Sequence, residues 1–265
     1  MIMKADLYNL EGKVEKQIDL PKFFNTEYKP AIIKRAVLAM RSMDRQPYGS
    51  DPLAGKRSSA HYHGYRRYRY TMMNKEMSRI PRIHGKVGYM HMRARVAPHA
   101  VKGRKAHPPK AEKIWKLKIN KKELKYAIRS ALAACMDKNL LEMRGHKFIT
   151  SPVIFVKDME ELNKTKQIME LFKKIGISPE IERAKEKKIR AGKGKSRGRK
   201  YRNKKSVLII VSSECNLKKA CANLAGADVC TVNDINPELL APGTQAGRLL
   251  ITTEPALAKL DERFG

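Results

Sequence analysis

The sequence predicts an α/β fold, namely a three-layer α/β/α body with a mostly parallel sheet, plus a long extended internal loop and a second basic extension. Short apolar runs alternate with segments of helical periodicity along most of the 265 residues, which favours strands joined by covering helices. Two segments interrupt this alternation, and both are strongly basic. We therefore expect a single α/β domain over residues 1–265, with an extended loop at 46–109 and a basic segment at 183–205 inserted in it.

The first half of the predicted body begins with a hairpin. Residues 5–20 alternate apolar and polar side chains around Leu10-Glu11-Gly12, which is typical of two short strands and a turn. Residues 30–45 place apolar side chains at helical spacing, with Pro30 suited to the first turn. A second helix is expected over 120–138, where Asn120 would cap the N-terminus and Glu123 would be its reciprocal capping partner.

The second half of the predicted body alternates strands with helices. Apolar runs at 153–156, 207–211, 229–232 and 249–252 indicate buried strands. A helix is expected through 162–175 with Gly176 at its end, and another through 217–224 that stops near Gly226. A short final helix would carry Leu257 and Leu260. This order of elements favours a largely parallel sheet that is covered on both faces.

The charge of the chain is concentrated in the two interrupting segments. The sequence has 57 Lys and Arg against 26 Asp and Glu, a net charge of +31. Residues 41–110 carry +14 and residues 183–205 carry +12, which leaves +5 for the other 172 residues. Because so many cations cannot be buried, these segments should bind a polyanion. No run approaches the roughly 18 apolar residues of a membrane span, and the first residues lack the apolar core of a signal peptide, so we expect no membrane partner and a cytoplasmic location.

The composition of the first basic segment indicates RNA. Residues 61–70, HYHGYRRYRY, interleave four tyrosines with three arginines. Guanidinium groups bind phosphates and stack on bases, and tyrosine rings stack on unpaired bases. The glycines of the second segment, within residues 187–205, would let its backbone follow phosphates closely. We expect both segments to be largely disordered in free solution and to become ordered on binding.

Metal, nucleotide and catalytic sites are not expected. The spacings of the six histidines in residues 46–109 fit no familiar zinc pattern, and no cysteine lies nearby. A P-loop ending at Gly194-Lys195-Ser196 would need a glycine where the chain has Ile189. Carboxylates are sparse in the basic segments, and no Gly-rich turn follows a predicted strand. We therefore expect no enzyme activity, no cofactor and no small-molecule substrate. The histidines are His61, His63, His84, His91, His99 and His107.

Several motifs resemble the archaeal form of the fourth large-subunit ribosomal protein family, from the first strand to the end of the chain. They are RQPYGSDPLAG at 45–55, KRSSA at 56–60, MMNKEMSRIPRIHG at 72–85, GRKAHPPKAEK at 103–113, RAGKGKSRGR at 190–199 and LAPGTQAGRLL at 240–250. The resemblance implies a structural constituent of the large ribosomal subunit that binds ribosomal RNA and supports assembly. It also implies that the internal loop lines the peptide exit tunnel, with large-subunit ribosomal RNA, other large-subunit proteins and the nascent peptide as partners.

The resemblance places the tip of the loop within residues 79–88. Gly85 and Gly88 would permit a tight reversal there, and Arg79, Arg82 and Lys86 would face RNA or the tunnel; His84 completes the predicted tip. Charge and resemblance together predict two sets of RNA-binding residues. In the loop these are Arg45, Lys56, Arg57, Tyr62, Tyr65, Arg66, Arg67, Arg69, Arg93, Arg95, Arg104 and Lys105. In the second segment they are Arg190, Lys193, Lys195, Arg197, Arg199 and Arg202.

Two other classes of function remain open on the residues alone. A DNA-compacting architectural protein would use the same charge, and it would bind duplex DNA as well as it binds RNA. An RNA-modifying enzyme would use the α/β body, and it would need a cofactor pocket with a phosphate-binding turn. A competition between duplex DNA and structured RNA separates the first alternative from RNA binding, and turnover on RNA would support the second.

Overall fold

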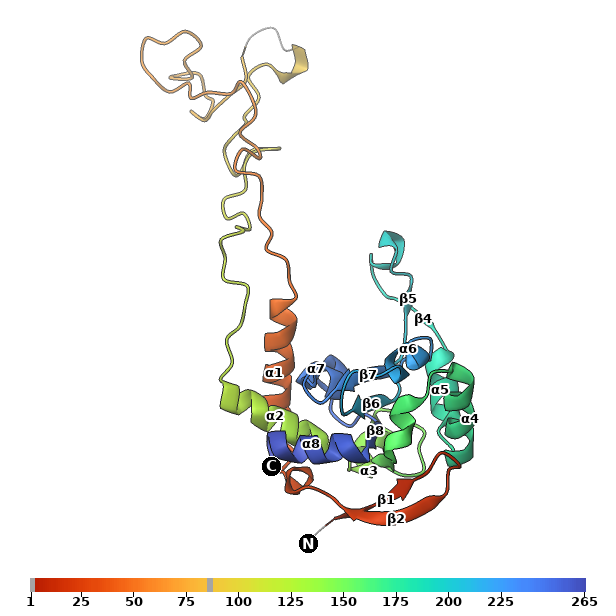
Figure 1. Cartoon of the computed structure of the whole chain (residues 1–265). Helices are drawn as coiled ribbons and strands as arrows, with labels where there is room; N and C mark the ends of the chain where they lie inside the picture. Colours follow the sequence, from red (N-terminus) through yellow and green to blue (C-terminus); the bar gives the residue numbers. More distant parts are fainter. Residues whose placement is uncertain (1–2, 85–87) are drawn as a thin grey trace. The chain divides into compact units, whose positions relative to one another are not determined.

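A six-stranded sheet forms the centre of the body, with the strand order β2-β1-β3-β8-β6-β7 (Figure 1). The computed structural model describes residues 3–84 and 88–265. Strands β1 and β2 pair antiparallel, and the other pairs are parallel, so the predicted mostly parallel sheet is confirmed. The strands are β1 (Lys4–Tyr8), β2 (Val14–Asp19), β3 (Val153–Phe155), β6 (Leu208–Val211), β7 (Asp228–Thr231) and β8 (Leu250–Thr253).

The helices cover both faces of this sheet, which confirms the three layers. Because successive side chains of a strand point to opposite faces, Ile154 and Ile210 join one buried cluster, whereas Phe155 and Ile209 join the other. The first cluster includes residues of α1, α2 and α8, and the second includes residues of α4, α5 and α6. The helices are α1 (Pro30–Met43), α2 (Lys121–Ala133), α3 (Lys138–Met143), α4 (Thr165–Ile175), α5 (Ser178–Lys185), α6 (Leu217–Cys221), α7 (Pro237–Leu240) and α8 (Glu254–Phe264).

The predicted capping of α2 is wrong in its details. Asn120 occupies the N-cap position but makes no side-chain cap hydrogen bond. Glu123 pairs instead with Arg35 of α1, with Oε1 and Nη1 3.0 Å apart. The helix also ends at Ala133 rather than near 138, because Asp137 starts α3 by accepting a hydrogen bond from the Asn139 backbone N–H at 2.9 Å.

Other differences from the sequence prediction concern short elements. Helix α4 begins at Thr165, after Leu162, and α6 ends at Cys221. Helices α5 and α7 were not predicted because they have 8 and 4 residues, which is shorter than the window in which helical periodicity can be recognised. No helix among the described residues is long and apolar enough to cross a membrane.

The chain divides into two compact units. Residues 1–43 and 116–265 form the body, and residues 44–115 form a second unit that we call the loop unit. Within the body, the backbone N–H of Leu117 donates to Oγ of Ser42 at 2.9 Å. This hydrogen bond holds together the two points at which the body chain is interrupted by the loop unit.

Candidate nucleic-acid interface

The loop unit begins and ends in two extended runs of chain that lie side by side (Figure 1). The backbone N–H of Ser50 donates to the carbonyl of Pro109 at 2.9 Å. A Cβ atom at Gly55 would lie 2.5 Å from the Arg104 nitrogen, and one at Gly49 would lie 2.8 Å from the Ala111 nitrogen. Glycine is therefore required where the two runs touch, which gives a physical reason for both glycines of the sequence motif at 45–55.

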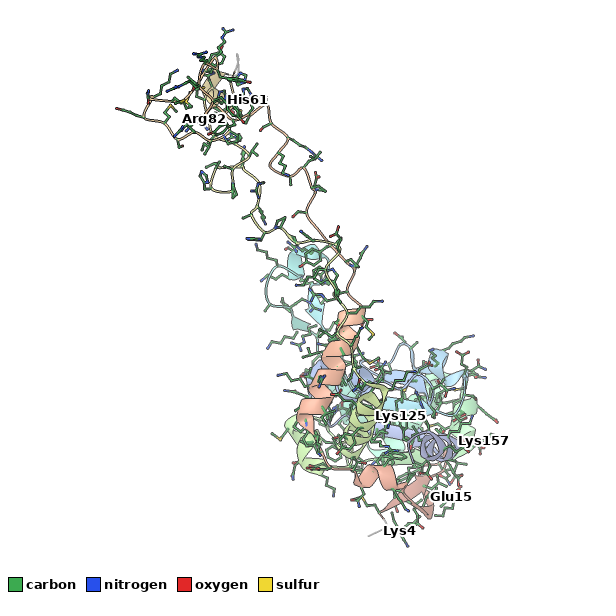
Figure 2. All side chains as sticks on the ribbon, turned by 90° about the vertical axis from the view of Figure 1, so that its left-hand side faces the viewer. Lys4, Glu15, His61, Arg82, Lys125 and Lys157 are labelled. Atoms are coloured by element: carbon green, nitrogen blue, oxygen red, sulfur yellow. The ribbon has the colours of Figure 1, made fainter. Side chains whose placement is uncertain are left out.

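Between these runs the chain forms a small tip in which three segments pair through isolated bridges. Arg82 pairs antiparallel with His61 on one side and with Ala94 on the other. Next to these bridges, the Ile83 backbone N–H donates to the Arg93 carbonyl at 3.0 Å. Figure 2 labels His61 and Arg82 together at this end of the loop unit. The only described helical turn between 44 and 115 is a 3-10 turn at Gly88–Met90.

Most of the predicted RNA-binding side chains of the loop unit are exposed. Only Arg95 and Arg104 of that set are half-buried, and the Arg95 guanidinium donates to the Val101 carbonyl at 3.1 Å. In the predicted tip, Arg79 and Gly88 are exposed and His84 is half-buried. Gly85 and Lys86 lie outside the described residues. The exposed members are Arg45, Lys56, Arg57, Tyr62, Tyr65, Arg66, Arg67, Arg69, Arg93 and Lys105.

Arg82 differs from the sequence prediction. It was expected to face RNA or the tunnel, but it is only 8% exposed. Its guanidinium donates to the Ser78 carbonyl at 2.9 Å and to the Met92 carbonyl at 2.9 Å. The side chain therefore ties three parts of the tip together, because a guanidinium satisfies several backbone acceptors in a segment that has little secondary structure.

Aromatic rings accompany the exposed cations of the loop unit. The rings of Tyr62 and Tyr65 meet edge to face with centroids 5.2 Å apart, and Tyr65 is 58% exposed. The Arg69 guanidinium lies 5.0 Å from the Tyr70 ring, and that of Arg93 lies 5.4 Å from the Tyr89 ring. Such surfaces suit unpaired bases, which stack on rings and on guanidinium planes.

The sequence analysis missed a second aromatic group, at the start and end of the loop unit. The rings of Tyr48 and Trp115 lie 4.5 Å apart. Arg45 and Lys113 approach the same Trp115 ring at 5.2 and 5.3 Å. The available signal was that Trp115 is the sole tryptophan of the chain and lies beside a predicted basic segment.

The backbone of the loop unit is strained. Seven of its described residues other than glycine have positive φ, including the β-branched Val96 at 69°. The left-handed conformation costs an L-residue about 1–2 kcal/mol, and this unit has few buried apolar side chains to offset that cost. This cost favours stabilising contacts from outside the chain. The seven are Arg67, Tyr70, Asn74, Glu76, Met92, Val96 and Lys102.

The second basic segment forms a small hairpin, which the sequence analysis did not predict. Strands β4 (Lys188–Ile189) and β5 (Tyr201–Arg202) pair antiparallel, and a 3-10 turn at Lys195–Arg197 lies between them. Half-buried Arg190 braces the hairpin by donating to the Arg199 carbonyl at 3.1 Å. The other predicted RNA-binding residues of this segment are exposed, namely Lys193, Lys195, Arg197, Arg199 and Arg202.

A buried ionic cluster anchors the hairpin to the body. Glu180 of α5 accepts hydrogen bonds from Nη2 of Arg183 at 2.6 Å and from Nδ1 of His146 at 2.8 Å. Arg183 also donates to the Lys205 carbonyl at 2.9 Å, so it joins the two ends of the segment. Burial raises the pKa of Glu180, but these hydrogen bonds outweigh it and hold the pKa below its ordinary value. Burial lowers the pKa of His146, although Glu180 opposes this shift.

Arg248, which belongs to the motif at 240–250, has a structural role in the body. Its side chain is fully buried, and it donates to the carbonyls of Ser206 and Val207 at 2.9 and 3.0 Å. Its charge is balanced by Asp228, with Nη2 and Oδ2 2.6 Å apart. Arg248 thus connects the start of β6 to the start of β7, which fixes the chain where it returns from the hairpin.

The described body shows no activated nucleophile among its cysteines. Burial raises the pKa of Cys135 to about 11 and those of Cys221 and Cys230 to about 12. These thiols are protonated at neutral pH, and the thiolate is the reactive form. They serve as small apolar side chains of the core.

Comparison with known proteins shows similarity over almost the whole chain. A family model described as the ribosomal protein L4/L1 family matches residues 18–263. The large ribosomal subunit protein uL4 of Methanocaldococcus jannaschii is 49% identical over 265 residues, which are 99% of this chain and 100% of the relative. That of Nanoarchaeum equitans is 48% identical over 267 residues, 98% of each chain. That of Methanosphaera stadtmanae is 44% identical over 265 residues, 98% of this chain and 97% of the relative.

Proposed function

Because the chain belongs to the ribosomal protein L4/L1 family, it is a structural constituent of the large ribosomal subunit, and we propose that residues 46–109 insert into folded large-subunit ribosomal RNA. The observation that carries this proposal is the concentration of exposed cations and stacked rings in the loop unit. The family is not one of enzymes, and the chain binds ribosomal RNA and other ribosomal proteins as its relatives do.

Each part of the loop unit has its own task in this proposal. The two extended runs contact phosphates of RNA segments on either side through their exposed lysines and arginines. The rings near Tyr62 and Tyr65 stack on unpaired bases, since side chains cannot read the deep groove of A-form RNA. The tip reaches the exit tunnel, where Arg79 faces RNA or the nascent peptide and Arg82 maintains the fold of the tip from within.

The hairpin at 188–202 is a second RNA contact in this proposal. Its exposed cations lie on a turn in which Gly198 has φ +78°, a conformation that glycine adopts without strain. The ionic cluster at Glu180 fixes the base of the hairpin to the body, so the charges of the turn are presented from a rigid support. Arg183 is engaged in that support and does not bind phosphate.

The strained backbone of the loop unit supports an assembly role. A segment whose strained conformation is stabilised by contacts with a partner folds when that partner is present. The loop and the RNA around it therefore order together, and each stabilises the conformation of the other. This coupling makes the loop a determinant of subunit assembly as well as a component of the finished particle.

Replacement of residues 46–109 by a short Gly/Ser linker tests the proposal. The linker can close the body, because Ser42 and Leu117 are already hydrogen bonded. We expect a folded body by circular dichroism that no longer co-sediments with large subunits in high salt. A matched control replaces the turn at 193–199 by Gly/Ser residues and should weaken incorporation less. Normal incorporation of the loop-deleted chain would refute the role assigned to the loop.

A competition assay separates this proposal from duplex-DNA compaction. Full-length protein is mixed at fixed salt with a labelled large-subunit RNA fragment, and either unlabelled RNA or duplex DNA of equal length is added. The tyrosine-rich loop should make RNA the better competitor. Equal competition by duplex DNA would show that the charge acts without the stacking contacts.

A further inference from the structure

Three histidine side chains meet in the tip of the loop unit, and the proposed RNA contacts do not require them. One ring nitrogen each from His61, His63 and His84 lies within 4.8 Å of the other two. Nε2 of His84 is 2.8 Å from Nδ1 and 2.9 Å from Nε2 of His61, and the rings of His61 and His63 stack with centroids 4.4 Å apart. The residues are separated in sequence by as many as 23 positions, so their spacing does not reveal this cluster.

The pairing of the tip explains why these side chains converge. His61 and Arg82 are opposite each other in an antiparallel bridge. The bridge brings the segment of His61 and His63 next to the segment of Arg82 and His84. The His63 ring is held against the second segment, with its Nε2 3.2 Å from the Arg82 carbonyl.

The environment of the cluster prepares the rings as ligands. Nε2 of His63 lies 3.2 Å from the Arg82 carbonyl. As a donor to this carbonyl, Nε2 leaves the lone pair on Nδ1, which is the usual way in which a backbone carbonyl orients a metal-binding histidine. His63 is only 2% exposed, and the Tyr70 ring stacks on His84 at 5.5 Å, so both rings are held in place.

We propose that His61, His63 and His84 bind one divalent transition-metal ion, and that this ion is Zn²⁺. Three imidazoles with a fourth position taken by an oxygen ligand are an established zinc environment. Zn–N bonds of about 2.1 Å place the ligand nitrogens roughly 3.4 Å apart in a tetrahedral site. Because the His61 and His84 rings are perpendicular, binding requires the His61 ring to turn so that one of its nitrogens points to the ion. Mg²⁺ and Ca²⁺ are excluded as occupants because they prefer oxygen ligands.

The bound ion would act as a cross-link within the tip. It joins the segment at 61–63 to the segment at 84, which otherwise meet through a few hydrogen bonds and ring contacts. Because such a site is incomplete in an unfolded chain, the free energy of metal binding stabilises the folded tip. The ion would thereby fix the tip conformation that the surrounding RNA receives.

Titration of the full-length chain with Zn²⁺ tests this proposal, with calorimetry for stoichiometry and Co²⁺ absorption for tetrahedral geometry. We expect one ion per chain. The variants His63→Ala and His84→Ala should weaken binding by at least roughly 100-fold, the upper end of the loss when only an outer partner of a ligand is removed. The matched control, His99→Ala with His107→Ala, removes two exposed histidines of the same loop unit and should leave binding unchanged.

A second measurement is made in assembled subunits, so it does not depend on whether the loop is folded in the isolated chain. Zinc is quantified in large subunits assembled with the wild-type chain and with His63→Ala, and we expect one ion per subunit fewer in the variant. Equal zinc contents would overturn the proposal, and so would equal losses in the cluster and control variants. The variants retain the cations of the loop, so RNA binding by the assay described above should persist if the metal site alone is lost.

Discussion

At the scale of single residues, buried charges in this chain hold segments in place rather than performing chemistry. Glu180 receives hydrogen bonds from His146 and Arg183, and Arg248 receives its countercharge from Asp228. Removing one partner of a buried ion pair leaves the other without compensation, which is costly. These residues are therefore sensitive points of the body even though they lie away from the exposed RNA-binding cations.

Glu180→Gln should lower the free energy of unfolding of the body by about 3 kcal/mol, the usual loss when a buried pair is broken. The substitution keeps the shape of the side chain but leaves the Arg183 charge uncompensated. Urea unfolding followed by circular dichroism measures the change. The control is Glu182→Gln, an exposed position of the same helix, which should have almost no effect. Similar losses in both variants would contradict the assigned cluster.

The same cluster predicts an acid-sensitive body. The pKa of His146 and that of Glu180 are both lower in the folded chain than their ordinary values of 6.5 and 4.5. The unfolded chain therefore binds protons at a higher pH than the folded chain does, so stability falls as pH decreases. The loss should begin below pH 6.5 as the unfolded His146 becomes protonated, and it should continue below pH 4.5 through Glu180. Thermal unfolding between pH 8 and pH 4 measures it, and a His146→Gln variant should lose the upper part of the decline.

Arg79 and Arg82 provide a contrast within the tip. Arg79 is exposed, so Arg79→Ala should reduce the log–log salt slope of RNA binding by about 0.7–0.9, the contribution of one phosphate contact. Arg82→Ala should weaken binding with a smaller change of slope, because its guanidinium is bound to backbone carbonyls. Filter binding at several KCl concentrations distinguishes the two effects. Identical slope changes would mean that Arg82 also contacts phosphate.

At the scale of elements, the close approach of the two extended runs in the loop unit can be disrupted by a single substitution. Gly55→Val should reduce incorporation into subunits, because its side chain would collide with the Arg104 backbone and φ is +76° at this position. Ala54→Val adds similar bulk at an adjacent exposed position and should be tolerated. Quantification of the chain in purified subunits compares the two variants.

The elements also show what the sequence could and could not predict. Strands β3 and β6 were predicted because strands buried on both faces are continuously apolar, and α4 was predicted because its apolar positions recur with helical periodicity. The hairpin of β4 and β5 was not predicted, since its two-residue strands lack alternation. The position of Arg82 was beyond sequence reasoning as well. An arginine in a basic loop is indistinguishable by composition from its exposed neighbours. Only the pairing of the tip buries the Arg82 guanidinium, where it donates hydrogen bonds to backbone carbonyls.

At the scale of the whole molecule, the division of charge determines how binding responds to salt. If ten of the thirty cations in residues 41–110 and 183–205 contact phosphate, the binding constant should fall with a log–log slope of roughly −7 to −9. The chain that lacks residues 46–109 keeps the cations of residues 183–205 and should show a shallower dependence. Comparison of the full chain with the linker variant lacking 46–109 measures the difference. Equal slopes would place the phosphate contacts outside the loop.

The position of β8 in the sheet has a consequence for the order in which the protein is made. This strand lies between β3 and β6, yet it is synthesised after both of them and after both basic segments. Until residues 250–253 emerge, the inner edges of β3 and β6 have no partner, and the two halves of the sheet cannot join. Folding of the body must therefore wait for β8, while the basic loop has been exposed since its synthesis. The newly made protein passes through a period in which its most cationic segment is available to any RNA before its body can fold.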